Sequence, residues 1–386
     1  MYPWNPQRYR AVGEKEGIDY AVLDAAIAAI ERIQAVNAAL PPLLTLMHLS
    51  KETGISYRFL RKVVGRRVDP YSSFALRKRT PGLRRTRKIH IPDDVVLKLQ
   101  RWISQAILRQ VRPHKASFGY HPGSSPEFAA RQHLNARWLV KIDLADFFDN
   151  IREPAFYDVF RSLGYSDLLS FELARLVTRA ELATEKRGDT ETHAIPFYAT
   201  NRNGFLPQGA PTSPMMSNLV MRSADGLLMD LAKRHGYRYS RYADDLVFSC
   251  AAKSTRHNAQ QLQIDAIDTL RECGFTPNQR KCKIVAPGGR KIVLGLHVDG
   301  PKLRLPQSFK DNIRLHLYYL SSADHGPAAH ASKRRSSIAS VYAHVNGLIS
   351  WSKSIEPRFY QNAKAQFNAV NWPPEVVGMV HERWNG

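Results

Sequence analysis

The chain has 386 residues and is strongly basic, with 56 Lys and Arg against 34 Asp and Glu, a net charge of +22 and a pI of about 10.0. A hydrophobic fraction of 44% excludes a disordered protein, and three irregularly spaced cysteines exclude a disulfide framework or a zinc site. Without an apolar run of 18 residues or a secretory leader, a cytoplasmic protein with no membrane partner is expected. The positive charge favours a nucleic-acid partner, because cations that neutralise phosphates release counterions.

The N-terminal part of the chain is predicted to be helical. Apolar residues recur at helical spacing from Asp19 to about Val36, and Pro41 and Pro42 end this helix. A helical pair is predicted over 43–49 and 56–64, with Thr53-Gly54 between its members. We interpret the pair as packing scaffold, with direct nucleic-acid binding as the less favoured alternative.

A basic hairpin is predicted next. The stretch 51–90 contains thirteen Lys and Arg against two acidic residues, a net charge of +11. Within it, 73–77 and 87–91 alternate like strands around the turn signal Thr80-Pro81-Gly82. Such density favours phosphate contact over a merely solvated edge. The predicted nucleic-acid-binding residues of the hairpin are Arg77, Arg84, Arg85 and Lys88.

Further elements follow along the chain. A helix is predicted from Asp93 to Val111, and a buried strand over 138–144 carries Asp143 near its end. Helices are predicted at about 153–163 and 166–183, and the polar stretch 185–203 is predicted to be a loop or an insertion.

Two adjacent aspartates, Asp244 and Asp245, lie where two β-prone runs meet. Such a pair is costly to keep ionised unless a cation lies nearby, although an Asp-Asp turn alone is more often a solvated loop. Asp143 supplies a third carboxylate on a β element, and three carboxylates form a hard oxygen ligand set suited to Mg²⁺. Two such ions about 4 Å apart would support phosphoryl transfer.

The third feature is a loop over 205–214 fixed by glycine and proline, which feeds a helix with apolar periodicity. Backbone N–H groups at a helix N-terminus can face an anion or a base pair. Without the aspartates, a purely structural loop would be the better interpretation.

Together these stretches closely resemble the palm motifs of reverse transcriptases. The motifs are Lys141-Ile142-Asp143-Leu144-Ala145-Asp146-Phe147-Phe148, Leu206-Pro207-Gln208-Gly209-Ala210-Pro211-Thr212-Ser213-Pro214 and Tyr242-Ala243-Asp244-Asp245. The resemblance implies an α+β right-hand polymerase fold with an antiparallel palm sheet. The implied domains are an N-terminal helical extension (1–42), fingers (43–135), palm (136–300) and helical thumb (301–386).

The resemblance also implies roles for individual residues. Two Mg²⁺ ions, with Mn²⁺ as an alternative, would be held by Asp143, Asp244, Asp245 and the Leu144 carbonyl. Phe148 would exclude a 2′-hydroxyl, so that the product is DNA, and Lys281 would protonate pyrophosphate, with Lys283 as an alternative. The implied nucleotide-binding residues are Gln208 and Gly209 together with Arg87 and either Lys78 or Arg79. The implied nucleic-acid contacts are His133, Tyr242, Gly295 and Trp351, the last of which could instead belong to the core.

Among these enzymes the chain looks most like bacterial retron and related defence-associated reverse transcriptases. It has Ala129-Ala130-Arg131-Gln132-His133 where retron enzymes often have Asn-Ala-x-x-His, and Val293-Leu294-Gly295 where they have Val-Thr-Gly. The implied partners are dNTPs, a structured non-coding RNA as template and primer, its single-stranded DNA product, and an effector or toxin protein.

Several alternatives stay open at this point. They are a defence-associated enzyme with different priming, an RNA-binding protein with a retired palm, and an RNA-templated RNA polymerase. Phe148 argues against the last of these. Group II intron maturases and viral enzymes with RNase H are disfavoured by the short segment after the palm.

Overall fold

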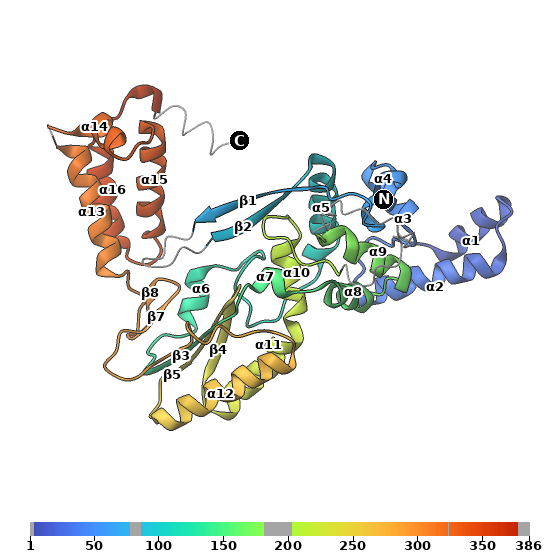
Figure 1. Ribbon diagram of the computed structural model, residues 1–386, viewed down its shortest axis with the longest axis horizontal. Coiled ribbons are helices and arrows are strands. Elements are labelled where there is room, and N and C mark those ends of the chain that lie inside the picture. Colours follow the sequence, from blue (N-terminus) through green and yellow to red (C-terminus); the bar gives the residue numbers. More distant parts are fainter. Residues whose placement is uncertain (1–3, 78–85, 181–202, 323, 377–386) are drawn as a thin grey trace, which may run out of the picture.

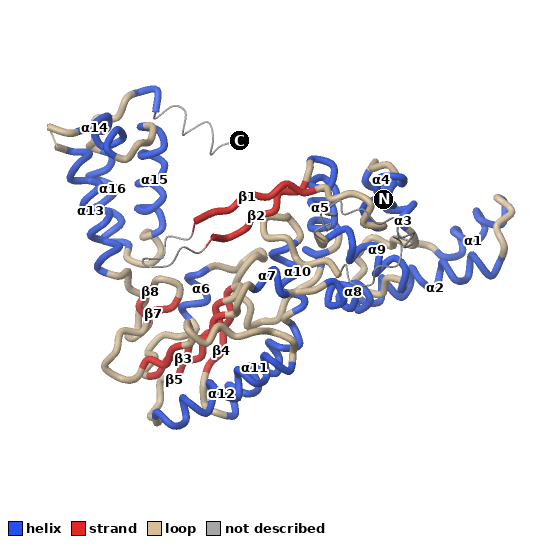
Figure 2. Tube along the Cα trace, viewed as in Figure 1, coloured by secondary structure: helices blue, strands red, loops and turns tan. Residues whose placement is uncertain are grey.

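A computed structural model describes residues 4–77, 86–180, 203–322 and 324–376. The α+β class is confirmed: a central sheet carries helices, a long hairpin lies above it, and a helical unit stands at one end (Figure 1). In the described part of the chain, strands are found in the hairpin, the central sheet and one small ribbon, as the colouring of Figure 2 shows. Among the described residues, no helix is long and apolar enough to cross a bilayer.

Helices form the N-terminal part. The predicted helix after Asp19 is α2, and the predicted pair is α3 and α4, with Gly54 in the left-handed conformation after α3. A preceding helix, which the sequence reading missed, is capped by the Asn5 side chain, which accepts a hydrogen bond from the Arg8 amide. The bounds are α1 Pro6–Lys15, α2 Tyr20–Val36, α3 Leu46–Thr53 and α4 Tyr57–Val64.

The predicted basic hairpin is present. β1 (Tyr71–Arg77) pairs antiparallel with β2 (Thr86–Pro92). The His90 amide in β2 donates a 2.7 Å hydrogen bond to the Gln208 carbonyl, which ties the hairpin to the 205–214 loop. Arg84 and Arg85, the alternatives Lys78 and Arg79, the turn at 80–82, and all but residue 203 of the predicted 185–203 loop lie outside the described residues.

Two predicted helices end earlier than expected. The helix after Asp93 is α5 (Asp94–Ala106), and a short 3₁₀ turn, η1 (Leu108–Gln110), takes up the rest. The helix predicted to reach residue 183 is α9 (Asp167–Val177). It ends there because the backbone of Arg179 pairs with that of Phe205 in both directions, at 2.9 and 3.0 Å.

The palm sheet has the strand order β4-β5-β3-β6, and all neighbours run antiparallel. Its strands are β3 (Trp138–Asp143), β4 (Arg238–Tyr242), β5 (Asp245–Cys250) and β6 (Lys283–Val285). α11 (Arg222–Arg234) and α12 (Arg256–Glu272) pack together against one face of the sheet (Figure 1). The remaining helices of this part are α6 (Pro126–Arg131), α7 (Phe147–Asn150), α8 (Glu153–Ser162) and α10 (Ser213–Val220).

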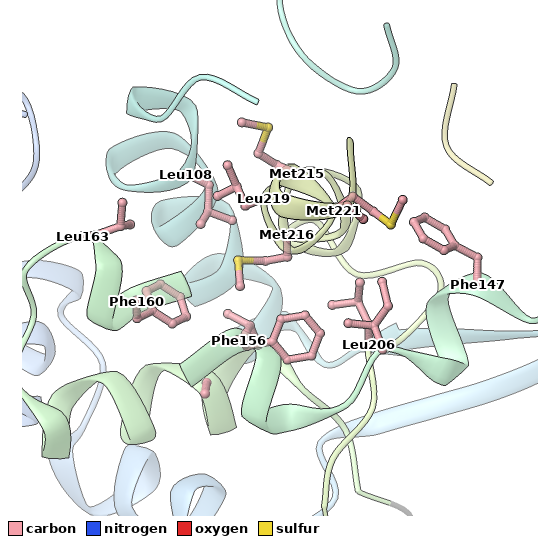
Figure 3. Close-up of a cluster of buried hydrophobic side chains, with 14 of the residues drawn as sticks. Leu108, Phe147, Phe156, Phe160, Leu163, Leu206, Met215, Met216, Leu219 and Met221 are labelled. Atoms are coloured by element: carbon pink, nitrogen blue, oxygen red, sulfur yellow. The ribbon is translucent and has the colours of Figure 1, made fainter. Parts of the chain in front are cut away.

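One continuous apolar core joins the N-terminal helices to the palm, because Leu40 and Leu43 belong to the same buried cluster as Phe156. Figure 3 shows part of it, with the Met216 side chain of α10 extending between the rings of Phe156 and Phe160. Burial of each such large apolar side chain contributes about 1.5–3 kcal/mol. This core fixes α10, and with it the loop that precedes it, against the rest of the palm.

The C-terminal helices have an apolar cluster of their own. They are α13 (Gln307–Ser321), α14 (Gly326–Lys333), α15 (Ile338–Trp351) and α16 (Pro357–Asn368), of which the sequence reading missed α14. A two-stranded ribbon, β7 (Ile292–Val293) and β8 (Leu296–His297), belongs to a third cluster that links the sheet to these helices. The proposed boundaries of fingers, palm and thumb stay predictions.

Candidate active site

The three predicted aspartates lie at one end of the palm sheet. Asp143 ends β3 and is the cross-strand partner of Asp245, which begins β5. Asp244 lies in the β4–β5 turn, and the amide of Leu144 donates to its carbonyl at 3.1 Å. Ala243 makes the tight turn with a left-handed φ of 55°, which is uncommon for a residue with a side chain. Strand register and turn geometry therefore bring together carboxylates that are a hundred residues apart.

Burial dominates the electrostatics of Asp244 and Asp245. It raises the pKa of Asp244, and the charge of Asp143 raises that pKa further. The pKa of Asp245 is also raised by burial, although Lys141 opposes the shift. The ionised forms are thus held at an energetic cost that a bound cation would offset.

Two lysines contact the carboxylates. The Lys281 Nζ lies 2.9 and 2.8 Å from the two oxygens of Asp143, and the Lys141 Nζ lies 3.3 Å from Asp245 Oδ2. Lys283, the alternative to Lys281, also lines this cavity. The lysine that contacts Asp143 is Lys281.

The donor chemistry of this site fits a hard divalent cation, because the groups predicted to bind it are carboxylate and backbone carbonyl oxygens. Within the described ranges, however, no three His, Cys, Asp or Glu side chains are already grouped to hold a metal. Asp143 and Asp245 are instead turned toward their lysines. A cation that binds here must therefore displace Lys281, Lys141 or both.

This competition predicts a small stabilisation by Mg²⁺. We expect Mg²⁺ at ten times its Kd to raise the thermal midpoint of the wild-type protein by about 2 °C, since binding at this concentration contributes only about 1.4 kcal/mol. Asp143→Asn should abolish this shift. Differential scanning calorimetry at matched ionic strength measures it, and an equal shift in the variant would contradict binding at this site.

One cavity of about 1500 Å³ gathers most of the predicted site. Besides the aspartates and Lys281, it is lined by predicted residues from the hairpin, the segment after β3, α7, the 205–214 loop and β4. They are Arg87, Lys88, Leu144, Phe148, Gln208 and Tyr242. Gly209 lies behind this lining with a φ of 118°, and a Cβ there would come within 2.7 Å of the His90 carbonyl oxygen. Only glycine fits this close approach, which explains the glycine of the motif.

His133 was predicted to contact nucleic acid, and the structure contradicts this. Its side chain is fully buried, with Nδ1 2.7 Å from the Ser249 hydroxyl and Nε2 2.6 Å from the Ser240 hydroxyl. Burial, together with the charges of Arg238 and Lys141, lowers the pKa of His133 to about 3. The residue joins two palm strands as a neutral imidazole.

A pH dependence of stability follows from this burial. His133 has an ordinary pKa of about 6.5 when unfolded, so the unfolded chain binds the extra proton and stability falls as pH drops below 6.5. We expect His133 to contribute about 2 kcal/mol less stability at pH 5 than at pH 7. Urea unfolding of the wild type and of His133→Leu at pH 5 and pH 7 isolates this contribution. If the free energy of unfolding changes equally with pH in both proteins, the account of His133 is refuted.

Two other predicted contacts lie outside the cavity lining. Gly295 lies in the β7–β8 turn with a φ of 81°, while its neighbour Leu294 reaches the cavity. Trp351, at the end of α15, packs against the apolar cluster that includes the ribbon. This packing agrees with the alternative prediction that Trp351 belongs to the core. The side chain of Arg77 lies outside the described residues.

The sequence reading also missed residues of the site. Tyr120 lines the cavity from the loop between η1 and α6, where no element was predicted. Asn278 donates from its side chain to Asp143 Oδ2 at 3.4 Å. The run Ser117-Phe118-Gly119-Tyr120, an aromatic-rich stretch with a glycine, was the available signal for Tyr120.

Known proteins are similar to this chain over most of its length. Residues 76–315 match the family described as reverse transcriptase (RNA-dependent DNA polymerase). Retron Mx65 reverse transcriptase of Myxococcus xanthus is 29% identical, covering 85% of this chain and 72% of its own. Retron Ec86 reverse transcriptase of Escherichia coli is 27% identical, covering 84% and 94%. Retron Mx162 reverse transcriptase of Myxococcus xanthus is 31% identical, covering 70% and 57%.

Two solved structures show a more distant likeness. A foamy viral protease-reverse transcriptase in complex with double-stranded DNA has a TM-score of 0.40 at 14% identity, covering 81% of this chain and 42% of that one. A telomerase from Candida albicans has a TM-score of 0.41 at 10% identity, covering 78% and 56%. The family match spans well over half of the sequence and includes all three aspartates. The chain therefore belongs to the reverse transcriptase family, whose members use divalent metal ions, and is a retron-type RNA-dependent DNA polymerase.

Proposed function

We propose that this enzyme copies a structured non-coding RNA into single-stranded DNA in an anti-phage defence system. The same RNA would serve as template and supply the priming hydroxyl, and an effector or toxin protein would complete the system. The observation that carries the chemistry is the convergence of Asp143, Asp244, Asp245 and Lys281 on one cavity that also presents Arg87 and Phe148. The retron relatives and the basic β1–β2 hairpin support an RNA substrate.

Asp143, Asp244, Asp245 and the Leu144 carbonyl would hold two Mg²⁺ ions, with Mn²⁺ as an alternative. When bound, these ions supply activation of the attacking hydroxyl and neutralise charge on the departing pyrophosphate. The hydroxyl gives its proton to solvent water and its oxygen attacks the α-phosphorus of a dNTP. A new P–O bond forms, and the bond to the bridging oxygen breaks as pyrophosphate leaves.

The remaining residues of the cavity act on the nucleotide. The Arg87 guanidinium, on the exposed edge of β2, can bind the triphosphate through paired N–H donors. The Phe148 ring would clash with a 2′-hydroxyl, and Gln208 would contact the nascent base pair. Lys281 has a half-exposed ammonium at the cavity, so once released from Asp143 it can give a proton to pyrophosphate.

A second priming mode has one sequence observation in its favour. Ala129 and Leu294 replace the Asn and Thr of the two signatures that retron enzymes often carry. A defence-associated enzyme outside the retrons would use the same cavity and start from another group. The two modes therefore share the chemistry of the aspartates and differ in what is attached to the first nucleotide.

The polymerase activity is tested with labelled dNTPs or rNTPs, Mg²⁺ and a primed RNA template. We expect extension by dNTPs alone and no extension by the double variant Asp244→Asn, Asp245→Asn. Ribonucleotide extension, or activity that survives in the double variant, would contradict the proposal.

The template and priming group are tested on the nucleic acid that copurifies with the protein. Sequencing it before and after RNase treatment should reveal one cognate RNA joined covalently to single-stranded DNA. A DNA product attached to protein, or one primed from a free 3′-end, would favour the second mode.

A further inference from the structure

The loop before α6 forms a strap beside the catalytic turn. The Arg241 amide donates to the Ala116 carbonyl and the Phe118 amide donates to the Arg241 carbonyl, both at 2.8 Å. The strap is also fixed from α10, because the Asn218 side chain donates to the Gly119 carbonyl at 2.7 Å. Residues 116–119 are thus held both by β4 and by the helix that follows the 205–214 loop.

Tyr120 ends this strap in a strained conformation. Its φ of 67° lies in the left-handed region, which bulky side chains rarely adopt. Such strain persists only where the surroundings enforce it, and it clusters at functional sites. Here the anchored strap enforces it, and the conformation places the Tyr120 ring at the lining of the active-site cavity.

The Tyr120 ring, which is 41% exposed, neighbours two aromatic rings of the site. Its centroid lies 6.4 Å from that of Phe148 and 6.1 Å from that of Tyr242, both within the range of aromatic pairs. Phe147 contacts Phe148 edge to face at 5.4 Å. Tyr120 also lines a second cavity of about 470 Å³, so it forms part of the wall between two open spaces.

We propose that Tyr120 is a positioning residue for sugar selection, which holds the Phe148 ring where it excludes a 2′-hydroxyl. This inference rests on the proposed role of Phe148. A substrate that adds one hydroxyl is rejected by a steric clash only if the wall cannot move. Loss of the Tyr120 ring would join the two cavities and leave Phe148 room to move away from the sugar.

The test measures single-nucleotide insertion and compares kcat/KM for a dNTP with that for the matching rNTP. Because the ratio of these values does not depend on the fraction of folded enzyme, a merely structural defect leaves it unchanged. Tyr120→Asn removes the ring, and asparagine tolerates the left-handed backbone better than alanine does. Tyr120→Gly provides a second variant that suits this backbone, and Tyr120→Phe keeps the ring.

We expect Tyr120→Asn and Tyr120→Gly to lower the preference for dNTP by about tenfold, within the range reported for changes of one pocket group. Tyr120→Phe should retain it. Tyr20→Ala, at an exposed tyrosine on α2, is the matched control and should leave the ratio unchanged. Adding Tyr120→Asn to Phe148→Ala should cause little further loss, since both act through one ring.

Two outcomes would overturn the inference, and they differ in what else they affect. If Phe148→Ala lowers the preference for dNTP while Tyr120→Asn and Tyr120→Gly both retain it, Tyr120 does not position the Phe148 ring. If Phe148→Ala itself leaves the preference unchanged, the proposed role of Phe148 fails, and the inference about Tyr120 fails with it.

Discussion

Replacing Asp244 with asparagine is expected to reduce polymerase activity by about 10³-fold or more while leaving the protein at least as stable as the wild type. The activity should fall because a proposed metal ligand is lost, and metal ions contribute several kcal/mol to such transition states. The stability is kept because burial raises the pKa of Asp244, so its ionised form opposes folding at neutral pH. Asparagine is similar in size and carries no charge.

Single-nucleotide extension and urea unfolding at pH 7 measure the two effects on the same preparation. Asp230→Asn, on the exposed face of α11 where Asp230 forms a surface ion pair with Lys233, is the matched control and should change neither quantity. A loss of more than about 2 kcal/mol in Asp244→Asn would show that this carboxylate supports the fold. Retention of activity would remove it from the proposed metal ligands.

The second large effect is expected at the buried ion pair beneath the catalytic turn. Arg241 and Asp225 are both fully buried and joined by two hydrogen bonds of 2.8 and 2.7 Å. Arg241 also donates to Asn218 Oδ1 at 3.0 Å and to the Ala243 carbonyl at 3.2 Å. Arg241→Met should cost about 3–5 kcal/mol, because Asp225 would be left as an unpaired buried charge.

Equilibrium unfolding in urea measures this loss, and the double variant Arg241→Met, Asp225→Leu provides the control. Removing both charges should recover most of the stability, since the penalty belongs to the charge left behind. A loss below 1 kcal/mol in the single variant, or no recovery in the double variant, would contradict this account.

Local sequence patterns were sufficient for the elements that carry the aspartates. The apolar run over 138–144, the β-prone runs around Asp244 and the loop before α10 each specify their own conformation, and all three formed as predicted. The gathering of Asp143 with Asp245 follows from the register of β3 against β5. Register depends on the whole sheet, so the sequence implied it through family resemblance and not through spacing alone.

The features that sequence analysis missed depend on partners far along the chain. His133 lacks exposure because Ser240 and Ser249, on two different strands, satisfy both of its ring nitrogens. α9 ends early because Arg179 pairs with Phe205. α14 has little apolar periodicity of its own. Its His330 contacts α13, where Nε2 of His330 lies 2.9 Å from Nδ1 of His316. None of these contacts produces a periodic pattern of apolar residues in the segment that it affects, so the sequence of that segment alone does not predict it.

The lysines that contact the proposed catalytic carboxylates also bear on how the enzyme folds. Because Lys281 and Lys141 balance two of the three negative charges, the polymerase can reach its native state before it encounters any divalent ion. Proteins whose ligands have no such substitute fold only when the metal arrives. Here removal of the metal by a chelator should abolish DNA synthesis without unfolding the enzyme. Adding the metal back should restore synthesis as fast as the lysine side chains rearrange.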